Sequence, residues 1–214
     1  IIQNVNTELP ENFCEKIKIG ENDDIICELI RRDAIKEFIV YINKNQISIK
    51  SKFTSIYETN SLLLKNIGTT LIEYAAFFGS IQIFNYLRLN EVDLTSSLWY
   101  YAIHGNNAEI IHILEDNKIN PPNFEKLSYD LLLKESIKSY HFDITKYIQK
   151  NYYNYEDGKS NVILDYSFRY YNFAFIQNNN INENTFYYLC KYDHYYLVDF
   201  LLKTKNININ RITI

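Results

Sequence analysis

The chain has 214 residues, of which 47% are hydrophobic and 22% are charged, so it is long and apolar enough to bury a core. Its formal net charge of −4 leaves no excess of basic side chains, and we expect no nucleic-acid partner. No apolar run approaches the roughly 20 residues that a membrane-crossing helix needs, so the sequence predicts no membrane span.

Three cysteines, Cys14, Cys27 and Cys190, lie far apart and outside any CxxC spacing. This pattern favours buried thiols in a reducing compartment over a disulfide frame or a zinc site. We therefore expect a cytoplasmic, intracellular protein. The sequence starts with neither Met nor a basic-then-apolar secretory leader, and we expect it to be a fragment that lacks its targeting information.

We interpret residues 1–22 as an N-terminal segment, either a cap or the tail of an earlier repeat. From residue 23 to residue 214 the apolar residues follow a helix-turn-helix pattern. Copies of the pattern start near residues 25, 70, 97, 131, 162 and 185, at intervals typical of helical solenoid repeats. Residues 43–67 are an insertion or a degenerate half repeat, which Ile56 and Leu62 to Leu64 predict to contain a helix of its own.

The second and third copies carry the clearest pattern. Thr70 and Ser97 precede their first helices, where a hydroxyl can accept hydrogen bonds from free backbone N–H groups. Glu73, three residues after Thr70, completes a capping box. Each second helix has apolar residues at positions i, i+1, i+3 and i+4, which give it one buried face. These residues are Ile83, Phe84, Tyr86 and Leu87 in the second copy and Ile110, Ile111, Ile113 and Leu114 in the third.

The other four copies follow the same template less closely. Thr185 is the predicted N-cap of the sixth copy, and the second helix of the fifth copy is expected to be cut short. Where the cap position is apolar, a polar residue one position earlier can cap the helix instead. These residues are Asp24, Asp130 and Asn161.

A small residue recurs in the first helix, which lets neighbouring first helices approach closely. This position holds Ala75, Ala102, Ser136, Ser167 and Cys190. One helix pair cannot bury both of its faces, so we expect the pairs to stack into one continuous all-α solenoid. The breaks at Pro121-Pro122 and after residue 152 are too short to separate domains.

These residues resemble the ankyrin repeat. Its signature, T-P-L-H-x-A-A-x-x-G-H before an apolar second helix, is similar to T-L-I-E-Y-A-A-F-F-G-S over residues 70–80. The third copy is similar through Ser97, Trp99, Ala102 and the stretch N-A-E-I-I-H-I-L over residues 107–114. The resemblance covers about residues 23–210 and is to a divergent ankyrin group expanded in some parasitic protists.

The sequence departs from that signature in two respects. No copy keeps the Pro after Thr or the His two residues further on; in the second copy these positions hold Leu71 and Glu73. The short interval between Thr70 and Ser97 also leaves little room for the β-hairpin finger of the family. The resemblance therefore implies an ankyrin-like solenoid of about six repeats with reduced or absent fingers.

Reactive side chains form no known catalytic motif, since P-loop, dinucleotide-binding, zinc-protease and nucleophile-elbow patterns are absent. The four His residues scatter along the copies, which favours structural or surface roles. The acidic pairs lie at helix boundaries or loops, where capping or solvated roles are ordinary. These pairs are Asp23-Asp24, Glu115-Asp116 and Glu156-Asp157. We expect neither enzyme activity nor a metal or cofactor.

Ankyrin-like proteins bind partners along the concave side of the solenoid. Carried over copy by copy, the resemblance predicts a protein-binding surface of Phe77, Phe78, His104, Lys138, Arg169, Tyr170, Tyr192 and Asp193. Aromatic and Arg side chains are enriched at binding hot spots. An alternative for Phe77 and Phe78 is that they pack beneath the insertion.

Two functions remain open from the sequence. The first is a non-catalytic scaffold or adaptor that binds a protein partner through the concave surface. The alternative is a regulatory or targeting segment of a larger protein whose enzyme domain lies outside this chain. Neither the partner nor the oligomeric state is indicated by the residues.

Overall fold

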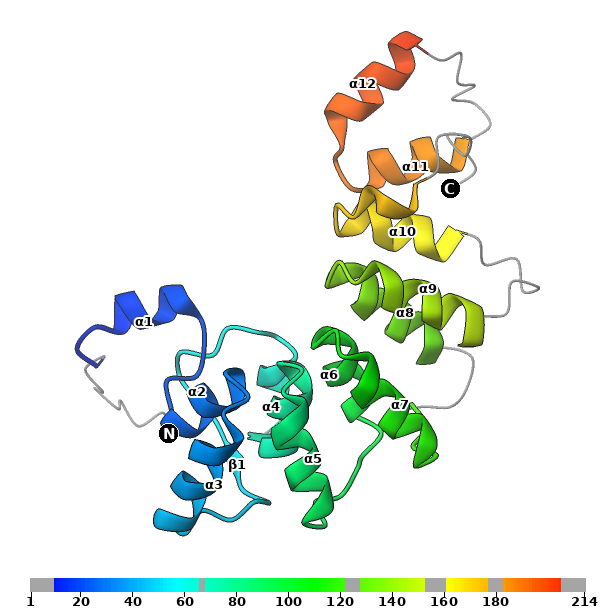
Figure 1. Cartoon of the computed structure of the whole chain (residues 1–214). Coiled ribbons are helices and arrows are strands. Elements are labelled where there is room, and N and C mark those ends of the chain that lie inside the picture. Colours follow the sequence, from blue (N-terminus) through cyan, green and yellow to red (C-terminus); the bar gives the residue numbers. More distant parts are fainter. Residues whose placement is uncertain (1–9, 66–67, 122–127, 153–160, 177–182, 205–214) are drawn as a thin grey trace, which may run out of the picture. The chain divides into compact units, whose positions relative to one another are not determined.

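The computed structural model describes residues 10–65, 68–121, 128–152, 161–176 and 183–204. Over these ranges the chain forms twelve α-helices, and its only strands are two short ones that pair with each other (Figure 1). The protein is therefore predominantly helical, which confirms the expected all-α class. The chain divides into two compact units, Ile1–Ile119 and Asn120–Ile214, and each unit is described by itself.

The first unit contains α1 (Phe13–Ile19) and three helix pairs. The pairs are α2 (Ile25–Arg31) with α3 (Ile35–Lys44), α4 (Leu71–Phe77) with α5 (Ile81–Leu89), and α6 (Leu98–His104) with α7 (Ala108–Asp116). The first helices α2, α4 and α6 pack side by side in chain order, and so do the second helices α3, α5 and α7. Figure 1 shows this two-row arrangement in the blue to green part of the chain.

The second unit repeats the pattern. It contains α8 (Ser128–Lys138) with α9 (Phe142–Tyr152), α10 (Asn161–Arg169) with the 3₁₀ turn η3 (Phe173–Phe175), and α11 (Glu183–Lys191) with α12 (Tyr195–Thr204). The first helices α8, α10 and α11 pack in series. The prediction of a shortened second helix in the fifth copy agrees with η3. All six first helices begin within three residues of the starts that the sequence predicts.

The same turn joins the two helices of every pair. One residue of each turn has a left-handed backbone: Asp33, Gly79, Asn106, Tyr140, Tyr171 and Asp193, with φ from 48° to 68°. In five of the turns the next residue donates its backbone N–H to a carbonyl in the last turn of the first helix, as Ser80 does to Ala75 at 2.8 Å. This is the Schellman arrangement, which satisfies carbonyls that a helix end leaves free.

The residue after the left-handed position also bonds to the preceding copy. Ser80 Oγ donates to the carbonyl of Ile30 at 2.6 Å. Asn172 Nδ2 donates to Ile137 at 2.9 Å, and His194 Nε2 donates to Phe168 at 2.8 Å. Three different side chains thus make the same connection between successive copies.

Small residues let the first helices approach closely. Ala75, Ala102, Ser136 and Ser167 are fully buried at equivalent positions, as predicted. The prediction for Cys190 is wrong, because Leu189 occupies the buried position and Cys190 is exposed. Cys14 is exposed as well, so only Cys27 fits the expectation of buried thiols.

Helix caps agree with the prediction in two cases. Thr70 and Glu73 form the complete capping box, with Thr70 Oγ1 accepting from the Glu73 N–H at 3.3 Å. Asp24 caps α2 by accepting from the Ile26 N–H at 3.0 Å. Ser97 makes no cap bond; its hydroxyl donates to Glu73 Oε1 at 3.0 Å and so joins two copies.

The other predicted caps differ because the helices start earlier than the apolar pattern. Helix α8 begins at Ser128, so Asp130 lies inside its first turn. Helix α11 begins at Glu183, so Thr185 is also a helical residue. Asn161 is the first residue of α10, and its side chain lies outside the described residues.

Asn residues close the second helices. The side-chain amide donates to the carbonyl four residues earlier at 2.7 to 2.9 Å in Asn45, Asn90, Asn117 and Asn151. Because the last carbonyls of a helix have no partner within it, this bond stabilises the helix end. Part of the high Asn content therefore has a structural role.

The insertion holds little regular structure. Helix α3 continues to Lys44, and β1 (Lys52–Phe53) later pairs antiparallel with β2 (Thr69–Thr70). Where Ile56 and Leu62 to Leu64 predict a helix, the described residues of the insertion form a 3₁₀ turn, η1 (Leu63–Lys65). The Phe53 ring packs edge-on against Tyr74 of α4, with ring centroids 5.3 Å apart.

Candidate functional site

The three predicted binding residues of the first unit lie at helix ends. Phe77 is the last residue of α4 and His104 the last of α6, and their rings stack with centroids 3.9 Å apart. Phe77 is only 5% exposed, so it supports its neighbours and offers little surface to a partner. Phe78 is half-buried, and its ring contacts Tyr74 at 4.7 Å and Phe77 at 4.9 Å.

The alternative prediction is that Phe77 and Phe78 pack beneath the insertion. Tyr74 contacts the insertion directly, through Phe53. Tyr74 is 1% exposed and lies between Phe53 of the insertion and Phe78. Burial raises the pKa of the Tyr74 phenol, and the charge of Arg31 opposes part of this effect. The phenol therefore stays protonated at neutral pH and can donate one hydrogen bond.

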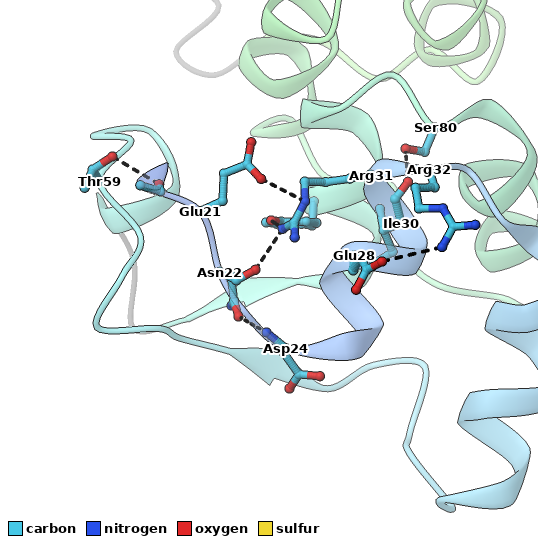
Figure 2. A network of polar contacts seen from close by, with 11 residues as sticks. Glu21, Asn22, Asp24, Glu28, Ile30, Arg31, Arg32, Thr59 and Ser80 are labelled. Atoms are coloured by element: carbon cyan, nitrogen blue, oxygen red, sulfur yellow. Dashed lines mark hydrogen bonds and ion pairs between the residues drawn. The ribbon is translucent and has the colours of Figure 1, made fainter. Parts of the chain in front are cut away.

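Arg31, the last residue of α2, joins the same surface and was not predicted from the sequence. Figure 2 shows its guanidinium between Glu21 and Asn22. Arg31 Nε lies 3.0 Å from Glu21 Oε2, and Nη1 donates to the Asn22 carbonyl at 2.8 Å and the Tyr74 hydroxyl at 2.7 Å. Its guanidinium also lies 6.0 Å from the centre of the Phe78 ring. The only sequence feature that points to Arg31 is the basic pair Arg31-Arg32 at the end of the apolar helix α2.

A cavity of about 170 Å³ lies behind this surface. The loop before α2, the insertion and α4 all contribute to its walls, through Asn22, Phe53, Glu58 and Tyr74 among others. Its walls combine apolar rings and Leu side chains with hydroxyl, amide and carboxylate groups. No sequence motif marks it, because its residues come from three separate segments.

The remaining five predicted residues belong to the second unit. Lys138 ends α8 and lies 3.7 Å from Glu135 Oε1. Arg169 ends α10 and is exposed, with its guanidinium 5.6 Å from the centre of the Tyr170 ring. The Tyr170 carbonyl accepts from the Tyr140 hydroxyl at 2.6 Å. The structure thus brings Arg169 and Tyr170 into contact.

Tyr192 and Asp193 follow α11. The Tyr192 hydroxyl donates to Asp165 Oδ1 at 2.8 Å, and Lys191 Nζ donates to the same oxygen at 2.7 Å. The hydrogen bond to Asp165 raises the pKa of Lys191. Asp193 is the left-handed turn residue and is exposed. Lys191, which sequence reasoning missed, is the last residue of α11, as Arg169 is of α10.

Within the described residues, no group of three or more His, Cys, Asp or Glu side chains is arranged to hold a metal ion. Asp23 pairs with Lys16 at 2.8 Å, and Glu115 pairs with His112 at 2.9 Å. Glu156 and Asp157 lie outside the described residues. Burial raises the pKa of the Cys27 thiol, which keeps it protonated.

Two further findings bear on the class of protein. In the part that the structure describes, no helix combines the length and hydropathy needed to cross a membrane. No family model matches the sequence, and no curated protein or solved structure matches it either. The likeness to ankyrin repeats therefore stays a prediction from the residues quoted above.

Proposed function

We propose that the chain is a non-catalytic, ankyrin-like repeat module that binds a protein partner through the ends of its first helices. The observation that carries this proposal is the turn that recurs in all six helix pairs. A turn of constant geometry presents the residues just before it in the same way in every copy. Within each unit, such a row of equivalent, variable side chains can form an extended binding surface, as it does in repeat proteins.

The residues at these positions fit a binding role. The last residue of each first helix is Arg31, Phe77, His104, Lys138, Arg169 and Lys191. Arg31 and Arg169 belong to a side-chain type that is enriched in binding hot spots, whereas Phe77 is buried and supports its neighbours. Phe78, Tyr170 and Tyr192 occupy the next position and add half-buried aromatic surface.

Site-specific photocrosslinking tests this proposal. The photoreactive residue p-benzoylphenylalanine is placed at position 78 or 170, and the chain is exposed to a lysate of its source cells under irradiation. We expect one protein to be captured from both positions. A matched control carries the same residue at position 40, because Val40 lies on second helix α3 and is 66% exposed.

The control decides the outcome. Capture from positions 78 and 170 but not from position 40 supports the proposed surface. Equal capture from position 40 contradicts it, and so does the lack of any specific product at 78 and 170. Competition by an excess of chain without the photoreactive residue separates specific capture from collisional labelling.

A further inference from the structure

The cavity behind Tyr74 has the size of a binding site for one side chain. Its volume is about 170 Å³, whereas a single buried water needs only about 10–15 Å³. Phe53, Leu63 and Leu64 supply apolar wall, and Leu64 is 54% exposed. The cavity can therefore take a group with an apolar stem that enters from the surface.

Most polar groups in the walls already have partners. Asn22 Oδ1 accepts from the Asp24 N–H at 3.0 Å, and Ser55 Oγ accepts from the Tyr57 N–H at 3.1 Å. Thr69 Oγ1 donates to the Leu63 carbonyl at 3.0 Å. The Tyr74 hydroxyl accepts from Arg31. These groups shape the cavity without calling for a ligand.

Glu58 is the exception. One carboxylate oxygen accepts from the Asn60 N–H at 2.9 Å, and the other has no hydrogen-bonding partner among the residues that the structure describes. Within the same ranges no ion pair joins Glu58 to a basic side chain. Its negative charge acts on Tyr74 of the wall and on Cys27 outside it, since it adds to the effect of burial in raising the pKa values of both groups.

A half-buried carboxylate beside apolar rings and Leu side chains favours a cationic donor, because a nearby opposite charge stabilises the ionised carboxylate. A lysine side chain has a methylene stem that suits Phe53 and the Leu residues and an ammonium group that suits Glu58. We propose that the cavity binds a lysine side chain of the protein partner, with Glu58 as its counter-ion. This inference rests on the proposed function for the source of the lysine.

The test uses small probes, so it does not depend on knowing the partner. The ¹⁵N-labelled chain is titrated with Nα-acetyl-lysine-N-methylamide and, separately, with the uncharged norleucine analogue, while amide NMR signals are recorded. We expect the lysine probe to shift the signals of Thr54, Ser55 and Leu64 in a saturable way. The norleucine probe lacks the charge, so its affinity is expected to be about fivefold lower than that of the lysine probe.

Two variants assign the effect to one carboxylate. Glu58→Gln keeps an oxygen that can accept from the Asn60 N–H and removes the charge, so the lysine probe should bind about fivefold more weakly. Glu91→Gln, an exposed residue after α5, should leave the affinity unchanged. Amide spectra that overlay away from the substituted residue establish that both variants are folded.

Three results would overturn the proposal: no response of the cavity signals, equal affinity for the two probes, or unchanged affinity in Glu58→Gln. The photocrosslinking experiment remains separate. Capture from positions 78 and 170 without a response to the lysine probe rejects the lysine site and leaves the proposed function standing. A response to the lysine probe without capture from positions 78 and 170 rejects the proposed function and leaves the lysine site standing.

Discussion

The carboxylate of Asp33 caps a helix of the following pair: its Oδ1 atom accepts a hydrogen bond from the Ile83 backbone N–H at 3.0 Å. The Oδ2 atom accepts from the Gln82 N–H, also at 3.0 Å. Asp33 is at the same time the left-handed residue of its own turn. One side chain therefore satisfies the N-terminus of α5 and links two copies.

Asp33→Ala is expected to lower the free energy of unfolding by about 1–2 kcal/mol, the usual cost of losing a cap residue. Asp33→Asn should cost less, because Asn tolerates the left-handed backbone and can accept one of the two hydrogen bonds. Urea denaturation followed by circular dichroism measures both. Equal stability of the parent and Asp33→Ala would contradict the capping role.

The bond from His194 to Phe168 allows a second prediction. His194→Leu leaves the buried Phe168 carbonyl without this donor and should lower the free energy of unfolding by about 1–3 kcal/mol. His194→Asn should retain most of the stability, because Asn172 makes the equivalent bond in the preceding copy. Thermal unfolding of both variants tests this prediction. It would be refuted if His194→Asn were less stable than His194→Leu.

Gly105, the C-cap residue of α6, packs closely against the end of α4. A methyl group on its Cα would overlap the Ala76 carbonyl of α4, a backbone atom that cannot turn away. Gly105→Ala should therefore cost about 1–3 kcal/mol in unfolding free energy. The neighbouring Asn106→Gly is the matched control, because its backbone is left-handed, and it should change stability by about 1 kcal/mol or less. Chemical denaturation compares the two, and equal effects would contradict the contact.

Phe77 and Phe78 are expected to behave differently on truncation. Phe77 is buried and stacked on His104, so Phe77→Ala should cost about 3–5 kcal/mol of stability. Phe78 is only half-buried, so Phe78→Ala should cost clearly less and affect partner binding more. Denaturation measures the loss of stability. The yield of the photocrosslinked product from position 170 measures the effect on partner binding. A smaller stability loss for Phe77→Ala than for Phe78→Ala would contradict this assignment.

The Lys16–Asp23 pair predicts a weak pH dependence near α1. The hydrogen bond from Lys16 lowers the pKa of Asp23 below its ordinary 3.8, so the pair stabilises the fold above that value. This contribution is lost as the pH falls through the lowered pKa of the folded state. Both side chains are substantially exposed, so salt should weaken the effect further.

Hydrogen exchange of the α1 amides measures this effect against Asp23→Asn. The parent should be better protected than the variant at about pH 5, and the two should converge towards about pH 2, where the carboxyl is protonated. A constant difference across this range would show that the pair does not act through its charge.

The apolar pattern predicted the helix pairs because each pair must bury one face, and that need leaves a 3.6-residue period in the sequence. It placed Cys190 in the close-packed position because Leu189 and Cys190 are adjacent, and a short helix leaves the register open by one residue. The left-handed turns at Tyr140 and Tyr171 could not be predicted, since bulky side chains seldom adopt that backbone.

The candidate site was predicted only in part for a related reason. Sequence positions gave the helix ends and so placed Phe78, Arg169 and Tyr170 there, and their role in binding stays a prediction. They could not give contacts between distant segments, such as Arg31 with Tyr74 or Ser97 with Glu73. The Glu58 cavity likewise depends on an insertion whose backbone has almost no regular period.

The recurring turn has a consequence for how such a chain can change over time. Its left-handed position holds Asp, Gly, Asn and Tyr, and its linking position holds Ser, Asn and His. The backbone path is thus tolerant of side-chain identity at the left-handed position and at the buried linking position. Substitutions in individual repeats can therefore change the side chains at these turns while the backbone path is kept.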